Sequence, residues 1–580
     1  MGQTPGVKQT IKLSVFAMGL AAEILRSNSV CASGFAPLTP DSVRPQPMEN
    51  EPNVPLPNPI EPFDSLPYPS LPESLPNIPG SITVSKFNFV GNTVFSPTEL
   101  NRAIASFIDR PISFAQLVEA AEKITQLYIS HGYITTGAYI PAQSLNSGIV
   151  EIQIVEGSLA AIEVNVEGRL QADYVRARLA NKIATPLQID RLQSALQLLQ
   201  LNPQIESLTA ELSSGIEPGT NILSVSVVSA DSFKIQANLS NNRNVSVGTF
   251  ERGVMLEEAN LLGIGDSLRL AYENTAGSDR YTWGYQIPIN ARDATLGFDF
   301  RWIKNEIVQS SFESADIDIE SRNYDLTWRQ PLLQRATPEV SQEFALSLTT
   351  ARRISLGTIM NVPQALSPGA DEDGEIRTSV LSLGQEWLQR NRQEVISARS
   401  QFNLGLDVLD ATILPEDPDG IFFSWRGQFS YLRSLSQSES PFVPVFWLRS
   451  ELQLAADPLI PTEQFSLGGA STIRGYRQDA LLTDSGFLAS AEFRLPLKRF
   501  DSLKATLQVA PFVDFGTGWN NDGESTEFNT LMGVGLGLLL QTPESFSARL
   551  DWGLPLINPD SQGSSLQEDG VYFQLQYDLF

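Results

Sequence analysis

Two short motifs in the C-terminal half of the chain carry side chains that could form an ion pair. Ile473-Arg474-Gly475-Tyr476 follows the glycine pair Gly468-Gly469, and Phe512-Val513-Asp514-Phe515-Gly516 comes later in the sequence. A guanidinium group enclosed by protein needs a partner, and a carboxylate can accept two parallel hydrogen bonds from it. Either motif considered alone, however, favours the simpler interpretation, in which Arg474 is an ordinary solvated loop arginine and Asp514 an ordinary turn acid.

Few other residues could support an active site. His131 is the only histidine and follows a predicted helix, where capping is its usual role, and Cys31 is the only cysteine. The chain has neither Gly-x-Ser-x-Gly nor Gly-x-x-x-x-Gly-Lys. The run Asp371-Glu372-Asp373-Gly374-Glu375 could bind calcium, although a solvated loop is the favoured interpretation. We therefore predict no enzyme, no cofactor and no metal site.

The elements that must position the two motifs are short alternating strands, which follow one another from about Phe233 to Phe580. A wall between lipid and water requires this alternation. The last strand ends on an aromatic residue, which predicts a closed barrel for an outer membrane, although Phe580 is one residue out of register. The predicted assembly signal consists of Phe573, Leu575, Tyr577, Leu579 and Phe580. Earlier segments alternate in the same way, with apolar Phe298, Phe300, Trp302, Phe402, Leu404 and Leu406.

Aromatic residues near the predicted strand ends fit the girdles of a membrane barrel at its two interfaces. They are Trp283, Tyr285, Trp328, Trp387, Trp425, Trp447 and Trp552. No stretch of about 18 apolar residues occurs, which excludes a helical membrane protein. The 580 residues include 66 acidic and 40 basic side chains, so nucleic acid is not an expected partner.

The N-terminus reads as an export signal followed by a tether. Lys8 and Lys12 precede the apolar run 13–25, and Val30-Cys31-Ala32 resembles a cleavage site, so residues 1–32 are a predicted signal peptide. Acylation of Cys31 is the less favoured alternative. Residues 33–80 hold 14 of the 37 prolines and are predicted to be an extended tether. The tether is a plain linker in the favoured interpretation, or a partner-binding strip in the other.

Between the tether and the barrel lie two copies of one small α+β unit, residues 81–157 and 158–230. In the first, Ser96-Pro97-Thr98-Glu99 predicts a capped helix start, and His131-Gly132 ends a second helix. Both units follow the order strand, helix, helix, strand, strand. In the first unit, the predicted strand 82–89 is followed by helices from 97 and over 113–131 and by strands 133–140 and 149–155. In the second unit, the predicted strand 162–166 is followed by helices 174–179 and 189–201 and by strands 205–212 and 222–228.

Motifs across both units and the barrel resemble those of the two-partner secretion transporters, the haemolysin secretion/activation family within the superfamily that joins POTRA domains to an outer-membrane barrel. The resemblance covers roughly residues 80–580, with its pieces in the family order. In the α+β units it rests on Gly132, Tyr133, Pro141, Glu156, Gly157, Pro218 and Gly219. In the barrel it rests on Asn260-Leu261-Leu262-Gly263, Gly265-Asp266, Tyr285 and Pro288.

The resemblance implies two POTRA domains and a barrel over residues 231–580, in which roughly 350 residues would form 16 antiparallel strands. It also implies a pore loop near residues 465–485, with Ile473, Arg474, Gly475 and Tyr476 at its tip. Phe512, Asp514 and Gly516 would then lie on a strand whose acid faces the lumen. With both motifs ordered as in the family, we predict an Arg474–Asp514 pair.

The function implied is an outer-membrane pore whose POTRA domains bind an unfolded exoprotein through its N-terminal secretion domain, by β-augmentation. Further implied partners are outer-membrane lipid, the barrel-assembly machinery and periplasmic chaperones. A barrel-assembly insertase, an ion or solute channel and a surface adhesin or receptor are the alternatives. Family members often carry a helix that plugs the pore. Residues 33–80 are too rich in proline to form such a helix. Residues 13–25 could form it if no signal peptide is cleaved.

Overall fold

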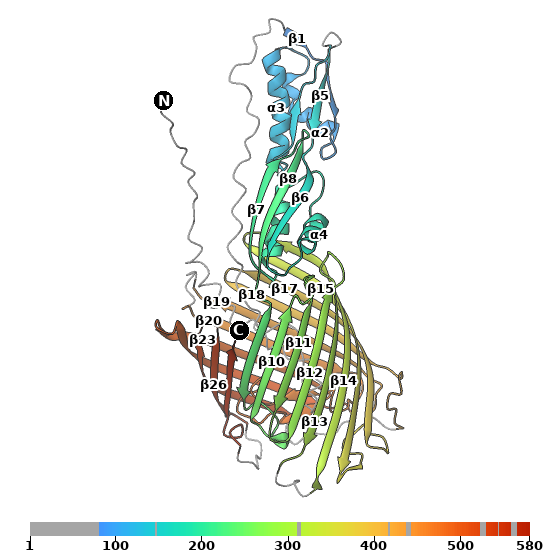
Figure 1. The fold of residues 1–580 in the computed structure, drawn as a ribbon, viewed down its shortest axis with the longest axis vertical. Helices are drawn as coiled ribbons and strands as arrows, with labels where there is room; N and C mark the ends of the chain where they lie inside the picture. The colour runs from blue at the N-terminus through green and yellow to red at the C-terminus, as the bar shows by residue number, and fades with distance from the viewer. Residues whose placement is uncertain are drawn as a thin grey trace.

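Two small α+β domains stand end to end on one mouth of a closed barrel (Figure 1). The computed structural model describes residues 81–144, 148–309, 315–415, 418–436, 442–521, 529–542, 545–557 and 565–579. The predicted signal peptide with Cys31, the predicted tether over residues 33–80, the candidate plug at 13–25 and Phe580 lie outside these ranges. No described helix is long and apolar enough to cross a membrane.

The first domain packs two helices on one face of a three-stranded sheet of order β2-β5-β4. Capping boxes start both helices, Ser96 with Glu99 and Ser113 with Gln116. The elements are β1 (Ser81–Thr83), β2 (Lys86–Val90), α2 (Pro97–Ala103), η2 (Ala105–Phe107), β3 (Pro111–Ser113), α3 (Phe114–Ser130), β4 (Gly137–Tyr139) and β5 (Ile149–Val155).

The strand predicted over residues 133–140 is shorter in the structure, because both of its ends are interrupted. Thr136 donates its backbone N–H to the Tyr133 carbonyl in a turn (3.1 Å), and Pro141 has no N–H for the ladder. Beyond this point the Gln143 side chain, instead of the backbone, makes the hydrogen bonds to β5. It donates to the Glu151 carbonyl (2.7 Å) and accepts from the Glu151 N–H (2.8 Å).

The second domain repeats this architecture with the sheet order β6-β8-β7 and its own apolar core. Its helices and strands match the predicted order, and α4 extends beyond the predicted residues 174–179. The elements are β6 (Ser158–Glu167), α4 (Ala172–Lys182), α5 (Ile189–Gln200), β7 (Ile205–Ser214) and β8 (Thr220–Ser229).

The barrel closes through 16 antiparallel strands, the number implied by the family resemblance. They are β9 (Phe233–Ser240), β10 (Glu251–Ala259), β11 (Ser267–Asn274), β12 (Ser278–Pro288), β13 (Thr295–Glu306), β14 (Ile317–Ala336), β15 (Val340–Ile359), β17 (Glu375–Asn391), β18 (Glu394–Gly405), β19 (Phe423–Ser434), β20 (Val445–Ala455), β23 (Ser485–Phe500), β24 (Ala505–Trp519), β25 (Thr530–Gln541), β26 (Phe546–Pro555) and β27 (Val571–Asp578). Smaller elements are η3 (Val245–Val247), β16 (Val362–Pro363), β21 (Phe465–Leu467) and β22 (Leu481–Thr483).

The barrel is closed by pairing of its last strand, β27, with its first, β9, from Gln574 opposite Ser240 to Asp578 opposite Gln236. The side chain of Asn241 continues this short ladder. It donates to the Val571 carbonyl (2.9 Å) and accepts from the Phe573 N–H (2.7 Å). A side-chain amide therefore supplies the next rung of the sheet at the end of the seam away from the two α+β domains.

Side chains alternate between the outer surface and the lumen, as the sequence pattern predicts. On β27, for example, Tyr577 is exposed outside whereas Tyr572 is buried inside. Trp447 contradicts its assignment to an interface girdle. Its ring faces inward, its Nε1 donates to the Ser430 hydroxyl (3.0 Å), and the Arg449 and Arg494 guanidinium groups lie 5.3 and 4.9 Å from it.

The second α+β domain is fixed to the barrel through turns on one side of the mouth. Arg178 of α4 lies flat on Tyr174 (3.4 Å to the ring) and donates to the Asp293 carboxylate between β12 and β13 (2.6 Å). The Gln171 N–H donates to the Gly263 carbonyl in the Asn260–Asp266 turn (2.8 Å). A Cβ on Gly265 would lie 2.3 Å from the Tyr174 ring, which explains the glycine in that motif.

We expect Arg178→Met to loosen this joint. Arg178 is almost fully buried and its partner Asp293 lies on the barrel, so its loss removes a link between the two parts of the molecule. Hydrogen exchange of α4 and of turn 289–294 should become several-fold faster. Arg176→Met is the matched control, because the partners of Arg176, Asp173 and the Ile162 carbonyl, both lie in its own domain, so turn 289–294 should be unchanged. Equal effects of the two substitutions would contradict the assignment.

Candidate functional site

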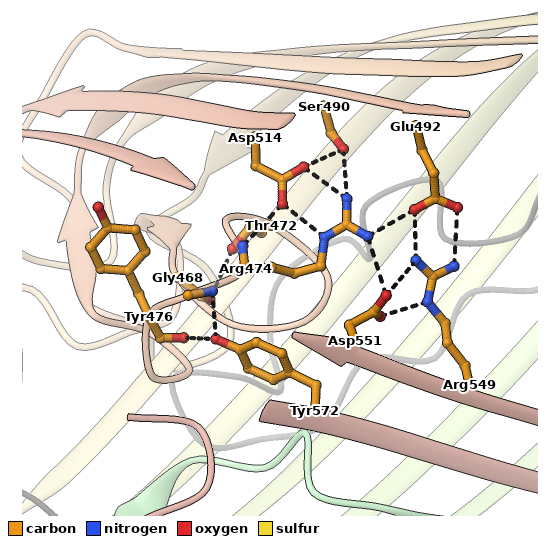
Figure 2. A network of polar contacts seen from close by, with 11 residues as sticks. Gly468, Thr472, Arg474, Tyr476, Ser490, Glu492, Asp514, Arg549, Asp551 and Tyr572 are labelled. Carbon is orange, nitrogen blue, oxygen red and sulfur yellow. Dashed lines mark hydrogen bonds and ion pairs between the residues drawn. The ribbon is translucent and has the colours of Figure 1, made fainter. Parts of the chain in front are cut away.

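The segment between β20 and β23 folds into the barrel and presents Arg474 to strands β23, β24 and β26 (Figure 2). Its base is the hairpin of β21 and β22, whose side chains pack with Ile473 and Tyr476 in one apolar cluster. The Thr472 hydroxyl donates to the Gly468 carbonyl (2.8 Å), which tightens the turn before Arg474. The pore loop predicted near residues 465–485 therefore occupies the lumen, with the predicted tip residues buried.

Arg474 and Asp514 lie together, as predicted from the two motifs. Arg474 Nε donates to Asp514 Oδ2 (2.8 Å) and Nη2 to Oδ1 (2.9 Å), while the Arg474 backbone N–H also reaches Oδ2 (3.1 Å). The carboxylate is further held by the Ser490 hydroxyl (2.6 Å). Arg474 is 2% exposed and Asp514 is 0% exposed, so water does not screen this bidentate pair.

Asp514 is only one of three acids around Arg474. Nη1 of Arg474 donates to Glu492 Oε2 (2.8 Å) and lies 3.7 Å from Asp551 Oδ1. Arg549 bridges these same two acids, with contacts of 2.6 Å to each, and Arg494 donates to Glu492 (2.8 Å). Three arginines thus face three carboxylates, and the network has no net charge. This balance offsets the cost of removing the charges from water.

The face of the Arg474 guanidinium packs on an aromatic ring. Its Cζ lies 3.3 Å from the centre of the Phe512 ring, so the predicted motif residue Phe512 adds a cation–π contact to the ion pair. Of the strand motif, Asp514 binds the edge of the guanidinium and Phe512 covers its plane. Gly516 serves the loop instead, because a Cβ there would lie 2.7 Å from Leu467.

Gly475 and Tyr476 attach the loop tip to the last barrel strands. The Tyr572 hydroxyl of β27 accepts from the Gly475 N–H (3.0 Å) and donates to the Tyr476 carbonyl. The Tyr476 hydroxyl in turn lies 2.9 Å from the Met532 carbonyl and 2.8 Å from that of Ile557. Gly475 has a φ of +104°, which favours glycine, and a Cβ there would lie 2.9 Å from the Pro555 nitrogen.

A buried glutamine joins the loop to the barrel seam. Gln567, which precedes β27, donates to the carbonyls of Asn241 and Arg243 beyond β9, the second at 2.8 Å. Its Oε1 accepts from the N–H of Gln478 in the loop (2.9 Å). The pore loop is therefore linked to the segments that flank both closing strands, before β27 and after β9.

The predicted POTRA motif residues gather at the joint between the two domains. The Gly157 carbonyl accepts from the Leu187 N–H (2.7 Å), and the Gly132 carbonyl accepts from that of Ile189 (2.9 Å). The Pro218-Gly219 turn packs on β5, since a Cβ on Gly219 would lie 2.3 Å from Val155 Cγ1. Tyr133 packs edge-on against Tyr128 in the first core. Most of this motif therefore sets the relative placement of the two domains.

Glu156 anchors the end of β5 inside the first domain. Its carboxylate accepts from the backbone N–H groups of Thr93 (2.6 Å) and Val94 (3.0 Å) and from the Tyr128 hydroxyl (2.7 Å). Burial by itself would raise the pKa of Glu156, but these hydrogen bonds stabilise the charged form and lower the pKa overall. The loop 91–95 is thereby tied to the strand that leads into the second domain.

We expect Glu156→Gln to destabilise the first POTRA domain by about 1.5–3 kcal/mol, the usual range for hydrogen bonds to a charged group. Because the folded pKa is lowered, the stabilisation is present above the unfolded pKa of about 4.3 and is lost as the pH falls through the lower folded value. Hydrogen exchange of residues 86–95 at pH 7 and at pH 4 measures this. Glu151→Gln on the same strand is the control, and an equal acceleration there would refute the anchor.

The remaining candidates take ordinary structural roles. Of the C-terminal signal, Phe573, Leu575 and Tyr577 face outward on β27 and Leu579 follows this strand; the partner of that signal is not part of the structure. His131 caps α3 through Nδ1 and the Leu127 carbonyl (2.8 Å), and Asp371 stabilises its own turn by accepting from the Glu375 N–H (2.8 Å). Within the described ranges, no three His, Cys, Asp or Glu side chains gather as metal ligands.

Sequence reasoning missed Glu492, Arg549, Asp551 and Tyr572. A usable signal existed for two pairs, since Glu492 with Arg494 and Arg549 with Asp551 are opposite charges two residues apart on strands. Residues with this spacing share a face, and opposite charges on the lumen face of neighbouring strands are natural partners of a buried arginine. Each of the three acids is paired with an arginine, and the arrangement holds the loop against the inner wall of the barrel.

Known proteins resemble this chain in sequence and in fold. The model of the haemolysin secretion/activation protein ShlB/FhaC/HecB matches residues 219–540, and that of the ShlB-type POTRA domain matches residues 82–157. The outer membrane transporter CdiB of Dickeya dadantii is 20% identical over 489 residues, 82% of this chain and 83% of the relative. The heme/hemopexin transporter protein HuxB of Haemophilus influenzae is 21% identical over 480 residues, 79% and 81% of the two chains. The solved structure of CdiB from Escherichia coli has a TM-score of 0.66 at 20% identity, covering 89% of this chain and 94% of that one.

Proposed function

Because this chain belongs to the haemolysin secretion/activation protein family ShlB/FhaC/HecB, we propose that it is the outer-membrane pore of a two-partner secretion system. Its POTRA domains lie in the periplasm, and its barrel spans the outer membrane. The cargo is an exoprotein that enters unfolded from the POTRA side and leaves through the lumen. The observation that carries this proposal is a pore loop held inside a closed barrel by a neutral, buried ion network.

The POTRA domains supply the receiving surface. Among the residues that the structure describes, no further strand pairs with the outer edges of β2 and β4 in the first sheet or of β6 and β7 in the second. An unfolded client can add a strand to such an edge through backbone hydrogen bonds, which tolerate many sequences. Docking of the second domain on turns 260–266 and 289–294 fixes the edges of β6 and β7 near the barrel mouth, with those of β2 and β4 farther out (Figure 1). Barrel-assembly machinery, chaperones and outer-membrane lipid are further partners during biogenesis.

The energy for export comes from the client in this proposal. Folding of the exoprotein outside the cell removes the threaded state from the equilibrium and pulls the remaining chain outward. The loop network keeps the pore in one arrangement until the client passes. Two POTRA domains favour secretion over insertion of other barrels, which is the nearest alternative.

Binding of the client tests the proposal directly. The full chain in detergent micelles should retain the N-terminal secretion domain of a large exported protein encoded beside it, at low salt and without denaturant. Replacement of residues 81–230 by a flexible linker of equal length should abolish retention. Failure of the intact chain to bind, or equal binding by both proteins, would overturn the assignment of client recognition to the POTRA domains.

A further inference from the structure

The two POTRA domains expose few large apolar side chains, and three of the four lie on one face of the first sheet. Over residues 81–144 and 148–230 they are Val90, Tyr139, Ile149 and Ile216, with exposed fractions of 38, 52, 47 and 100%. Their neighbours on the opposite side of the sheet, such as Ile152, are completely buried under the helices. A clustered apolar surface on an otherwise polar domain marks a binding site.

The register of the first sheet places these residues in one strip. Val90 on β2 and Tyr139 on β4 both lie opposite Gln153 of β5, so the three side chains form a row across the outer face. Ile149 is on the same face of β5, an even number of residues away. At its other end β5 reaches Val155, which contacts Gly219 in the turn that carries Ile216. These four apolar residues, the apolar strip, therefore follow β5 from Ile149 past Tyr139 to the turn of Ile216, with the polar Glu151 and Gln153 between them.

The chain itself enters the domain at the Ile149 end of this apolar strip. Ser81 begins β1, and four residues later the Ser85 N–H donates to the Gly148 carbonyl (2.8 Å). Lys86 then lies directly opposite Ile149. Residues immediately before Ser81 are thus tethered within a few residue lengths of the strip. Such tethering corresponds to an effective concentration of about 1 mM or more.

The sequence before Ser81 carries an apolar line with the period of polyproline II. That helix has three residues per turn, so every third side chain lies on one line. From residue 54 to residue 78 this line is apolar throughout, whereas the other two lines contain Asn, Ser, Glu and Asp. Its members are Val54, Pro57, Ile60, Phe63, Leu66, Pro69, Pro72, Leu75 and Ile78.

The segment is long enough to cover this surface. At a rise of about 3.1 Å per residue, positions 66–78 of a polyproline II helix span about 37 Å. The outer face of β5 from Ile149 to Val155 spans about 20 Å at 3.3 Å per residue, and the turn bearing Ile216 extends it further. Proline-rich segments dock on surfaces that present aromatic rings, which Tyr139 provides here.

We propose that the proline-rich segment before the first POTRA domain docks through its apolar line on the strip of Val90, Tyr139, Ile149 and Ile216. The segment lies on the outer sheet face in the resting protein, with Ile78 nearest Ile149 and the earlier residues toward Ile216. It shields apolar surface that would otherwise face the periplasm. The sheet face, rather than the strand edges, is the docking surface.

Hydroxyl-radical footprinting of the full chain in micelles tests this docking through side-chain accessibility. The triple variant Leu66→Ser, Leu75→Ser, Ile78→Ser should increase labelling of Tyr139 and Ile216 at least threefold over the unsubstituted chain. The matched control Leu56→Ser, Tyr68→Ser, Leu71→Ser removes apolar side chains from another line of the same segment and should leave labelling unchanged. The barrel, monitored by its heat-dependent gel mobility, should be intact in all three proteins.

Two results would overturn the proposal. Labelling of Tyr139 and Ile216 that is the same in the unsubstituted chain and the first variant would show that the segment is a plain linker. An equal increase in both triple variants would show that the apolar line has no special role. If an added client domain protects Tyr139 while the first variant leaves its resting accessibility unchanged, the strip belongs to the client and the intramolecular docking is wrong.

Discussion

Replacement of Arg474 by methionine is expected to abolish export and to lower the free energy of unfolding of the barrel by about 3–5 kcal/mol, the cost of breaking a buried charge pair. Methionine keeps much of the volume, but it leaves Asp514 and Glu492 buried without their central cation. The midpoint of urea unfolding and the amount of client in the medium measure the two effects. Arg477→Met, on an exposed arginine three residues further along the loop, should leave both unchanged.

Coupling between Arg474 and Asp514 follows from their shared hydrogen bonds. Asp514→Asn should also reduce stability and export, and the double variant should lose clearly less than the sum of the two single losses. The stability and export of Arg474→Lys should lie between those of Arg474→Met and of the unsubstituted chain, because lysine keeps the charge without the bidentate geometry. Strictly additive losses for Arg474 and Asp514 would show that the two residues act separately.

The second large effect is expected from Gly533→Ala on β25. A Cβ at Gly533 would lie 2.0 Å from the Arg474 carbonyl oxygen, so the loop tip must move or the strand must bend. Overpacking of this kind typically costs about 1–3 kcal/mol, and here it acts on the backbone beside the ion network. We expect at least a tenfold loss of export, with higher conductance in planar bilayers as the loop leaves the lumen.

Gly297→Ala is the matched control for that substitution. Gly297 also lies on a barrel strand, but the nearest atom to its Cβ would be the Thr327 carbonyl oxygen at 3.9 Å. Alanine therefore fits there without displacement, and export and conductance should equal those of the unsubstituted chain. If Gly533→Ala behaves like Gly297→Ala, the close approach of loop and wall is not needed for function.

The general architecture could be predicted from the sequence because alternation and capping are local signals. The capping box at Ser96 and Glu99 predicted the start of α2, and the period-two pattern predicted the outward face of β27. The Arg474–Asp514 pair could be predicted only because both residues sit in recognisable motifs. For Glu492 and Arg549 no motif exists, and their meeting depends on the register of strands that are distant in sequence.

The incorrect predictions also arise because contacts between distant segments cannot be read from a local pattern. A period-two pattern separates two faces but does not identify which of them meets lipid, so Trp447 was assigned outward although it packs in the lumen. The strand expected over 133–140 shortened because Pro141 interrupts the ladder and Gln143 replaces it. The roles of Gly157 and Gly219 could not be read from one domain, because each faces a neighbour that only the folded pair supplies.

Transport by the purified chain is the most direct test of the central claim. The chain is reconstituted in lipid vesicles with its POTRA domains outside, and an unfolded client carrying its N-terminal secretion domain is added. Full-length client should become protected from added protease over time in these vesicles, and should stay accessible in vesicles with Arg474→Met or without protein. Client that remains fully accessible with the intact chain, or is equally protected in empty vesicles, would contradict the assignment of this barrel as a protein-conducting pore.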